Sequence, residues 1–263
     1  MNSETAVSIP NVREAKRILC VQGHYDDNDG GAGGTIAALA AGGATIIYLT
    51  VTDDLVGVVD PAMPDEQAAA QLKREQEEAG EIIGVSEQYW LGYPDAGEYD
   101  YFELRQRIIK YIRQLRPDFV FTLDPWLPYE AHMDHIRTGL ATAEAVYLQS
   151  FVRLPVDPEV DKTYEPYDVA GIALYATHKP NIIFDISDYM ETKRQAFACY
   201  NAQFTPEGLE RVLGRFSRMA EEWAVREEFT HGEPLKVLTR NQLHGGETVR
   251  MMMHDGGATT GRR

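Results

Sequence analysis

The sequence is poor in cysteine and has no long apolar run. Its only two cysteines, Cys20 and Cys199, support neither a disulfide framework nor a cysteine-based zinc motif. No apolar stretch approaches the ~18 residues that a membrane-spanning helix needs. The first ten residues lack the basic and then apolar pattern of a secretory signal peptide. We therefore expect a cytoplasmic protein that does not enter a membrane.

Basic residues are also scarce. Lysine and arginine total 25 against 41 aspartates and glutamates, which gives a formal net charge of −16. Nucleic acids and anionic membrane surfaces bind clustered positive charge, so the composition excludes both as expected partners. Hydrophobic residues make up 44% of the 263 residues, which is enough for the core of one large α/β domain.

Short β-branched segments alternate with amphipathic or alanine-rich segments along the chain. Gly42-Gly43, Gly84 and Pro117 follow three of the predicted helices, where glycine and proline end helices. Such alternation predicts an α/β, Rossmann-like fold, with a mostly parallel sheet and helices on both faces. The predicted strands are 18–21, 45–51, 88–91, 119–123, 171–175 and 182–186. The predicted helices are 35–41, 66–83, 102–115, 134–149, 189–200 and 206–226.

The sequence shows no internal repeat or linker, so we predict a single domain over residues 1–250. Residues 151–168 contain Pro155, Pro158 and Pro166 among many charges and are interpreted as a proline-rich surface insertion. Residues 251–263 are rich in glycine and threonine and are predicted to form a mobile C-terminal tail.

Two short motifs stand out, His24-Tyr25-Asp26-Asp27 and His132-Met133-Asp134-His135. The first follows the first predicted strand, and the second follows the fourth. In the common strand order 3-2-1-4 these two strands are neighbours, and ligands bind outside their carboxyl ends. The predicted fold therefore brings the two motifs together.

The residue types suit a catalytic divalent metal. His24, Asp27 and His135 form a set of two imidazoles and one carboxylate, which favours one zinc ion per chain, with Fe²⁺ or Co²⁺ as other candidates. Asp26 is then able to take a proton from water, because a cation holds its neighbour Asp27 ionised. His132, supported by Asp134, suits a developing oxyanion.

Simpler interpretations of these residues exist. His24 and His135 could be unrelated loop histidines, and residues 26–30 alone would be interpreted as a solvated acidic turn. Residues 30–34 are nearly all glycine, which invites a nucleotide-binding interpretation with Asp53 or Asp54 as the ribose acid. The aspartates just ahead of those glycines would repel a pyrophosphate, and the G-x-G-x-x-G spacing fails. The glycines are instead expected to permit a close approach of the helix to the metal loop.

Aromatic residues occur in or near loops at the same predicted end of the sheet. Trp126, Tyr129, Trp90 and Tyr93 could stack on sugar rings or could simply pack under loops.

With these residues in view, the chain resembles the LmbE-like/PIG-L superfamily of metal-dependent N-acetylglucosamine deacetylases. The family patterns A-H-P-D-D-E and H-x-D-H correspond to residues 23–28 and 132–135. The resemblance extends over about residues 16–200, and residues 124–130 are similar to the diacetylchitobiose deacetylase branch. The other matching stretches are Gly33-Gly34-Thr35, Arg74-Glu75, Ile83-Gly84, residues 91–95, Pro180-Asn181 and Asp185-Ile186-Ser187.

The resemblance implies zinc bound by His24, Asp27 and His135, with Asp26 as general base and His132 and Asp134 as its catalytic partners. It also implies a homo-oligomer. The implied substrate contacts are Arg74 and Asp95, to which the aromatic pattern adds Trp126. The departures from the family pattern are Tyr25 in place of proline and Asn28 in place of glutamate.

The predicted function is zinc-dependent hydrolysis of the N-acetyl group of a small glycoside that contains N-acetylglucosamine. The products are acetate and a free amino sugar, so the expected partner is a small amino-sugar substrate. Two alternatives stay open. One is a metal-dependent amidohydrolase that acts on a non-sugar amide, and the other is a catalytically silent sugar-binding protein.

Overall fold

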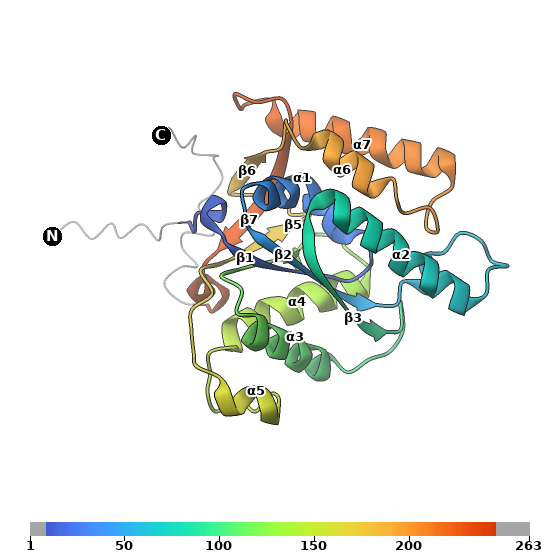
Figure 1. The fold of residues 1–263 in the computed structure, drawn as a ribbon. Helices are drawn as coiled ribbons and strands as arrows, with labels where there is room; N and C mark the ends of the chain where they lie inside the picture. Colours follow the sequence, from blue (N-terminus) through green and yellow to red (C-terminus); the bar gives the residue numbers. More distant parts are fainter. Residues whose placement is uncertain (1–8, 246–263) are drawn as a thin grey trace.

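The computed structural model describes residues 9–245, which form a seven-stranded sheet with helices on both faces (Figure 1). The strand order is β3-β2-β1-β4-β5-β7-β6. The first five strands are parallel, whereas β7 runs antiparallel to both β5 and β6. The predicted α/β class and the 3-2-1-4 order are confirmed. The strands are β1 (Arg17–Gln22), β2 (Thr45–Thr52), β3 (Val85–Tyr93), β4 (Phe119–Leu123), β5 (Gly171–Tyr175), β6 (Ile182–Asp185) and β7 (Gly232–Leu238).

The helices divide between the two faces of the sheet. Contacts group α1, α2, α6 and α7 together, and α3 packs with α4 across the sheet (Figure 1). The helices are α1 (Asp27–Ala41), α2 (Asp65–Ile83), α3 (Tyr101–Leu115), α4 (Met133–Leu148), α5 (Pro158–Thr163), α6 (Met190–Phe197) and α7 (Pro206–Ala224). Short 3₁₀ turns are η1 (Val12–Glu14), η2 (Leu55–Gly57) and η3 (Arg240–Leu243). Within residues 9–245, no helix is both long and apolar enough to cross a membrane.

Strand β1 shows why the core has two halves. Successive side chains of a strand point to opposite faces of the sheet. Ile18 and Cys20 therefore pack in the cluster under α1, α2 and α6, and Leu19 and Val21 pack in the cluster under α3 and α4. All four are fully buried, so β1 lies at the centre of the domain.

Helix α1 begins at Asp27, rather than after the glycine-rich segment as predicted. A Cβ at Gly31 or Gly34 would clash with the side chain packed against it, Tyr175 and Ile186 respectively. The glycines thus permit close packing of α1 against Tyr175 and Ile186. We had expected them to permit close packing against the loop that carries His24. This tertiary packing outweighs the low helix propensity of glycine.

A buried ion pair stabilises α1 where its backbone kinks at Ala32. The Glu233 carboxylate accepts hydrogen bonds from the Gly34 amide at 3.1 Å and from the Thr35 amide at 2.7 Å. Lys193 Nζ lies 2.6 Å from the same carboxylate and neutralises its charge. Glu233 therefore acts as a cap for the second half of the helix.

Strand β7 was not predicted from the sequence. It contains Pro234, which lacks the amide proton that a strand ladder uses. The strand forms because it fills the space between β5 and β6, pairing Ile172 with Leu238 and Ile182 with Leu235. Strand β3 likewise extends beyond the predicted 88–91 at both ends.

The proline-rich segment 151–168 contains the short helix α5, and Arg113 anchors the segment to α3. The Arg113 side chain is only 1% exposed. It donates hydrogen bonds to the carbonyls of Gln149, Phe151 and Leu154 and to Asp161 Oδ1, the last at 2.6 Å. The predicted mobile tail at 251–263 lies outside the described residues.

We expect Arg113→Met to destabilise the protein by about 1–3 kcal/mol, because Asp161 Oδ1 and the carbonyls of Gln149 and Leu154 lose their donor. Thermal unfolding monitored by circular dichroism measures the effect. Lys162→Met is the matched control, because Lys162 and its partner Glu159 are both mostly exposed. Equal melting temperatures for the two variants would contradict the anchoring role.

Candidate active site

The loops that follow β1 and β4 meet at one edge of the sheet. The two strands are paired in parallel, with Ile18 opposite Phe119. His24 lies in the loop between β1 and α1, and His135 lies in the first turn of α4. The structure therefore brings together the two motifs, as the predicted strand order requires.

Three side chains converge on one point. His24 Nδ1 lies 3.1 Å from His135 Nε2, which lies 3.2 Å from Asp27 Oδ1. His24 Nδ1 is also 3.5 Å from Asp27 Oδ2. Ligand atoms at about 2.0–2.2 Å from a tetrahedral metal are separated by about 3.3 Å. The donor set therefore fits a small divalent metal such as zinc.

Two alternative sets of possible metal donors also include His24. In one it combines with His132 and His135, and in the other with Asp95, His132 and Asp134. Asp134 Oδ2 is 3.8 Å from His24 Nε2 and 3.9 Å from His132 Nδ1, so this second set is looser. We favour His24, Asp27 and His135, because every pair of these side chains has donor atoms 3.1–3.5 Å apart, with Asp27 Oδ1 facing His135 and Oδ2 facing His24.

The charges around the imidazoles also favour a cation. Burial opposes protonation of His24, but hydrogen bonds with Asp134, Asp27 and Asp95 outweigh burial and raise its pKa well above the usual value. Burial likewise opposes protonation of His135, yet its interaction with Asp27 raises its pKa to about 9. A divalent metal bound here would supply the positive charge that these carboxylates stabilise, and it would displace the protons.

Asp26 is half-buried next to the converging ligands. Burial and the charge of Asp27 raise the pKa of Asp26 to about 7. Within residues 9–245, no other side chain donates a hydrogen bond to its carboxylate. The Asp26 carboxylate is therefore available to exchange a proton.

Several residues that the sequence analysis did not select hold this constellation in place. Tyr99 Oη donates to Asp134 Oδ1 at 2.7 Å, and the Ala96 amide donates to Asp134 Oδ2 at 2.8 Å. Glu130 accepts from the His132 amide at 2.7 Å, and its other oxygen lies 3.4 Å from His135 Nδ1. Their positions in loops that follow β3 and β4 are the only signal that the sequence offered.

Asp53 and Asp54 buttress the site and do not resemble ribose acids. Asp53 Oδ1 accepts from the Asp95 amide at 3.0 Å, and Asp54 Oδ2 accepts from the Tyr25 amide at 3.0 Å. Gln203 Nε2 donates to the same Asp54 oxygen at 2.7 Å. The two aspartates thus tie neighbouring loops to one another, which removes the basis of the nucleotide-binding interpretation.

Backbone strain concentrates at this edge of the sheet. In the described part of the chain, five non-glycine residues have positive φ, and four of them follow the carboxyl end of a strand. These are Asp54 after β2, Ala96 after β3, Tyr129 after β4 and Ala176 after β5, whereas Arg116 ends α3. Strained residues cluster at functional sites, so the pattern supports this edge as the site.

Three predicted substrate contacts occupy different places. Asp95 Oδ1 lies 3.2 Å from His24 Nε2, inside the cluster. Trp126 lies in the loop between β4 and α4 and is 53% exposed. Arg74 lies in the middle of α2, where its exposed guanidinium is 3.9 Å from Glu78. In the described structure Arg74 forms no ion pair or hydrogen bond with the histidine cluster.

The two departures from the family pattern have structural roles. The Tyr25 side chain is 6% exposed and packs in the hydrophobic core, where burial raises its pKa to about 12. Asn28 is buried. Its backbone amide donates a hydrogen bond to Gln22 Oε1 at 2.8 Å, and its side-chain Oδ1 accepts one from Tyr175 Oη at 3.0 Å. Both residues support the loop of residues 24–27 from the protein interior, and neither replaces a predicted ligand.

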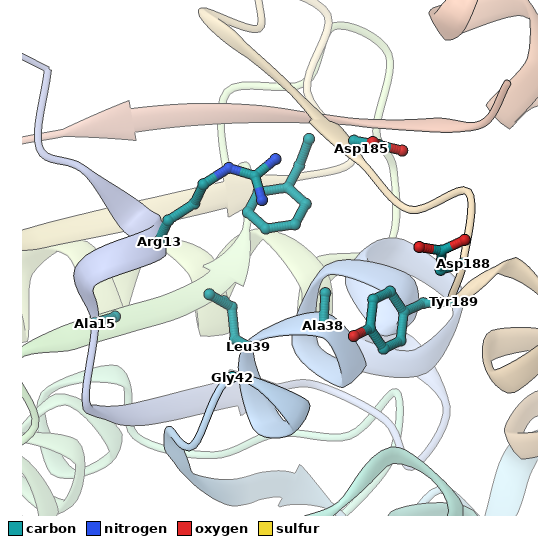
Figure 2. A pocket seen from close by; sticks show the side chains of 9 residues that line it. Arg13, Ala15, Ala38, Leu39, Gly42, Asp185, Asp188 and Tyr189 are labelled. Atoms are coloured by element: carbon teal, nitrogen blue, oxygen red, sulfur yellow. The ribbon is translucent and has the colours of Figure 1, made fainter. Parts of the chain in front are cut away.

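A separate pocket of about 280 Å³ lies between η1, the end of α1 and the segment after β6 (Figure 2). Arg13 borders it and stacks over the Phe184 ring at 4.0 Å. Asp188 and Tyr189 line the other side. None of the predicted catalytic or metal-binding residues lines this pocket, so it is not the candidate active site.

Comparison with known proteins decides the family. Residues 19–146 match the family model for PIG-L, described as GlcNAc-PI de-N-acetylase. The chain is 38% identical over 194 residues to a diacetylchitobiose deacetylase from Thermococcus kodakarensis, covering 73% of this chain and 71% of the relative. The chain belongs to the PIG-L, or LmbE-like, family. The predicted resemblance is thereby confirmed.

Other PIG-L relatives agree with this assignment. A crystal structure of N,N'-diacetylchitobiose deacetylase from Pyrococcus horikoshii, complexed with an inhibitor, superposes with a TM-score of 0.84 at 35% identity, over 91% of this chain and 90% of that chain. A 1D-myo-inositol 2-acetamido-2-deoxy-alpha-D-glucopyranoside deacetylase from Kineococcus radiotolerans is 31% identical over 54% of this chain and 47% of the relative. These PIG-L relatives are named as deacetylases, so the prediction of a deacetylase-type enzyme is confirmed at the level of the family.

Proposed function

We propose that this protein removes the N-acetyl group from a small glycoside that contains N-acetylglucosamine, releasing acetate and a free amino sugar. The observation that carries the proposal is the convergence of His24 Nδ1, His135 Nε2 and the Asp27 carboxylate beside the available carboxylate of Asp26. The names of the relatives support an N-acetylated amino sugar as the substrate class.

We assign the metal to His24, Asp27 and His135, with zinc as the proposed ion. A divalent metal bound there would polarise the acetamide carbonyl and make water a better nucleophile near neutral pH. The Asp27 carboxylate is held in position by the His24 amide at 2.8 Å. The ligands are therefore positioned before a substrate arrives.

Asp26 and His132 perform the proton transfers and the charge stabilisation in this mechanism. Asp26 accepts a proton from the attacking water and then delivers it to the departing amine nitrogen. His132 is 41% exposed at the start of α4 and faces His24 and His135 at ring-centroid distances of 4.5 and 4.6 Å. From there it can donate a hydrogen bond to the oxyanion of the tetrahedral intermediate. Asp134, held by Tyr99 and the Ala96 amide, supports His132 electrostatically.

Asp95 is better placed to orient His24 than to contact the sugar. Both of its carboxylate oxygens are engaged, one by His24 Nε2 at 3.2 Å and the other by the Val56 amide at 3.0 Å. A carboxylate on the outer nitrogen of a metal-binding histidine selects the tautomer that offers its inner nitrogen to the metal. We propose this role for Asp95, and Arg74 and Trp126 remain the proposed sugar contacts.

We expect Asp95→Ala to lower the zinc affinity by about 10–100-fold, because His24 loses the partner that orients its ring. Competition with a chromogenic chelator measures the affinity. Asp95→Asn keeps a neutral acceptor and should lose less. An unchanged zinc affinity together with a raised KM would assign Asp95 to substrate contact, as the sequence analysis first suggested.

Acetate release from N-acetylglucosamine and from diacetylchitobiose tests the proposed function. The purified protein is assayed as prepared, after chelation and after restoration of zinc. Release that disappears with the metal and returns with zinc is the expected result. Release only from non-sugar amides would favour the broader amidohydrolase, and saturable sugar binding without release would favour a silent binding protein.

A further inference from the structure

One ring nitrogen of His135 has no hydrogen-bond partner in the described part of the chain. His135 Nε2 faces Asp27 Oδ1 at 3.2 Å and is the atom that we assign to the metal. The opposite nitrogen, Nδ1, is buried and forms no hydrogen bond. A neutral imidazole that binds a metal through Nε2 carries its proton on Nδ1. That proton needs an acceptor, because a buried donor without one costs free energy.

Glu130 is the acidic side chain that faces this nitrogen. Glu130 Oε2 lies 3.4 Å from His135 Nδ1, and within residues 9–245 no other acidic side chain pairs with that atom. Both side chains are shielded from solvent, each being 22% exposed. The separation is slightly longer than that of an ordinary N–H···O hydrogen bond, and a small rotation of the carboxylate would close it.

A tight turn before α4 determines where Glu130 lies. The Glu130 amide donates a hydrogen bond to the Leu127 carbonyl at 3.2 Å, which closes the turn. Pro128 suits the second position of a type II turn, whose third position requires positive φ and is usually glycine. Tyr129 occupies that third position with a φ of 69°, although its ring is fully exposed and gains no packing there. Strain of this kind persists where the surrounding structure requires it, often at functional sites.

We propose that Glu130 is a positioning residue of the metal site, whose carboxylate accepts the Nδ1 proton of His135 and so presents Nε2 to the metal. Its other oxygen, Oε1, accepts from the His132 amide at 2.7 Å, which fixes the carboxylate beside the ring. A carboxylate on the outer nitrogen of a metal-binding histidine sets the tautomer, orients the ring and makes it a stronger ligand. This inference rests on the proposed function, because it takes His135 as a metal ligand.

A purely structural role for Glu130 leads to a different expectation. His132 is the N-cap of α4, and its own side chain makes no capping hydrogen bond. A carboxylate that accepts from an amide at the start of a helix stabilises that helix. If Glu130 served α4 alone, its removal would lower the melting temperature and leave the zinc affinity unchanged.

Glu130→Gln separates the two roles. The glutamine oxygen can keep the hydrogen bond from the His132 amide, but its NH₂ group then faces His135 Nδ1. An NH₂ group there favours the tautomer with the proton on Nε2, which opposes metal binding. We expect the variant to unfold at the temperature of the parent when metal-free and to bind zinc about 10–100-fold less tightly. Circular dichroism and competition with a chromogenic chelator measure the two quantities on the full-length protein.

Glu98→Ala is the matched control for the lost charge. Glu98 is exposed in the loop that follows β3, at the same edge of the sheet. In the described structure it pairs with neither His24 nor His135. Its removal should change the zinc affinity by no more than about twofold, because exposed charges interact weakly. Equal zinc affinities of the Glu130→Gln and Glu98→Ala variants would overturn the proposed role of Glu130.

Failure of the proposed function can be distinguished from failure of this inference, because zinc affinity is measured without a sugar. If the parent binds zinc but releases no acetate, a weaker affinity of Glu130→Gln still upholds the role of Glu130. If the parent binds no zinc, Glu130 has no metal ligand to orient and the inference is overturned. A lower melting temperature with the zinc affinity of the parent would also overturn it and would assign Glu130 to α4 alone.

Discussion

Asp26→Asn is expected to lower kcat by about 10²–10⁴-fold while the protein keeps its metal. The amide is nearly the same size as the carboxylate but cannot accept the proton from water or return it to the amine. Asp26 accepts no hydrogen bond from another side chain in the described structure, so the substitution disturbs little of the fold. The effect should therefore appear in turnover, not in stability or zinc content.

Two measurements check this expectation. Acetate release gives kcat, and metal analysis of the dialysed variant gives the zinc content per chain. Asn28→Asp is not a suitable control, because Asn28 is bonded to Tyr175 in the interior. Asp53→Asn is suitable, because Asp53 belongs to the neighbouring loop and bonds only backbone amides. An Asp26→Asn variant that retains most of its activity would remove Asp26 from the proposed role.

The second large effect concerns the metal itself. We expect Asp27→Ala to abolish tight zinc binding and, with it, nearly all turnover, because it removes the one carboxylate whose oxygens lie within 3.5 Å of both imidazole ligands. His132→Ala should instead keep zinc and lose about 10²–10³-fold in kcat, since it removes a donor to the oxyanion and not a ligand.

This pair of variants discriminates between the overlapping donor sets. In both alternative sets His132 would be a ligand and Asp27 would not. Zinc titration monitored by calorimetry measures both variants under the same conditions. Loss of zinc in His132→Ala, together with retention in Asp27→Ala, would transfer the metal to a set that contains His132 and invalidate the proposed mechanism.

The sequence by itself determined the class of fold and the meeting of the two motifs. Alternating strands and helices predict right-handed parallel connections, and the common order 3-2-1-4, which the structure confirms, places β1 beside β4. Because the carboxyl ends of parallel strands share one edge of the sheet, residues 24–27 and 132–135 were expected to come close. These conclusions depend on local patterns and a general rule of topology, which one sequence contains.

The tertiary structure decided whatever depends on contacts between distant segments. The glycine-rich start of α1 is helical because Tyr175 and Ile186 pack against it. Strand β7 forms because β5 and β6 each offer it a free edge for pairing. The contact of Asp95 with His24 and the positive φ of Tyr129 have no local sequence signal. Side-chain orientation and loop strain arise from the packing of the whole domain, so only the folded chain could reveal them.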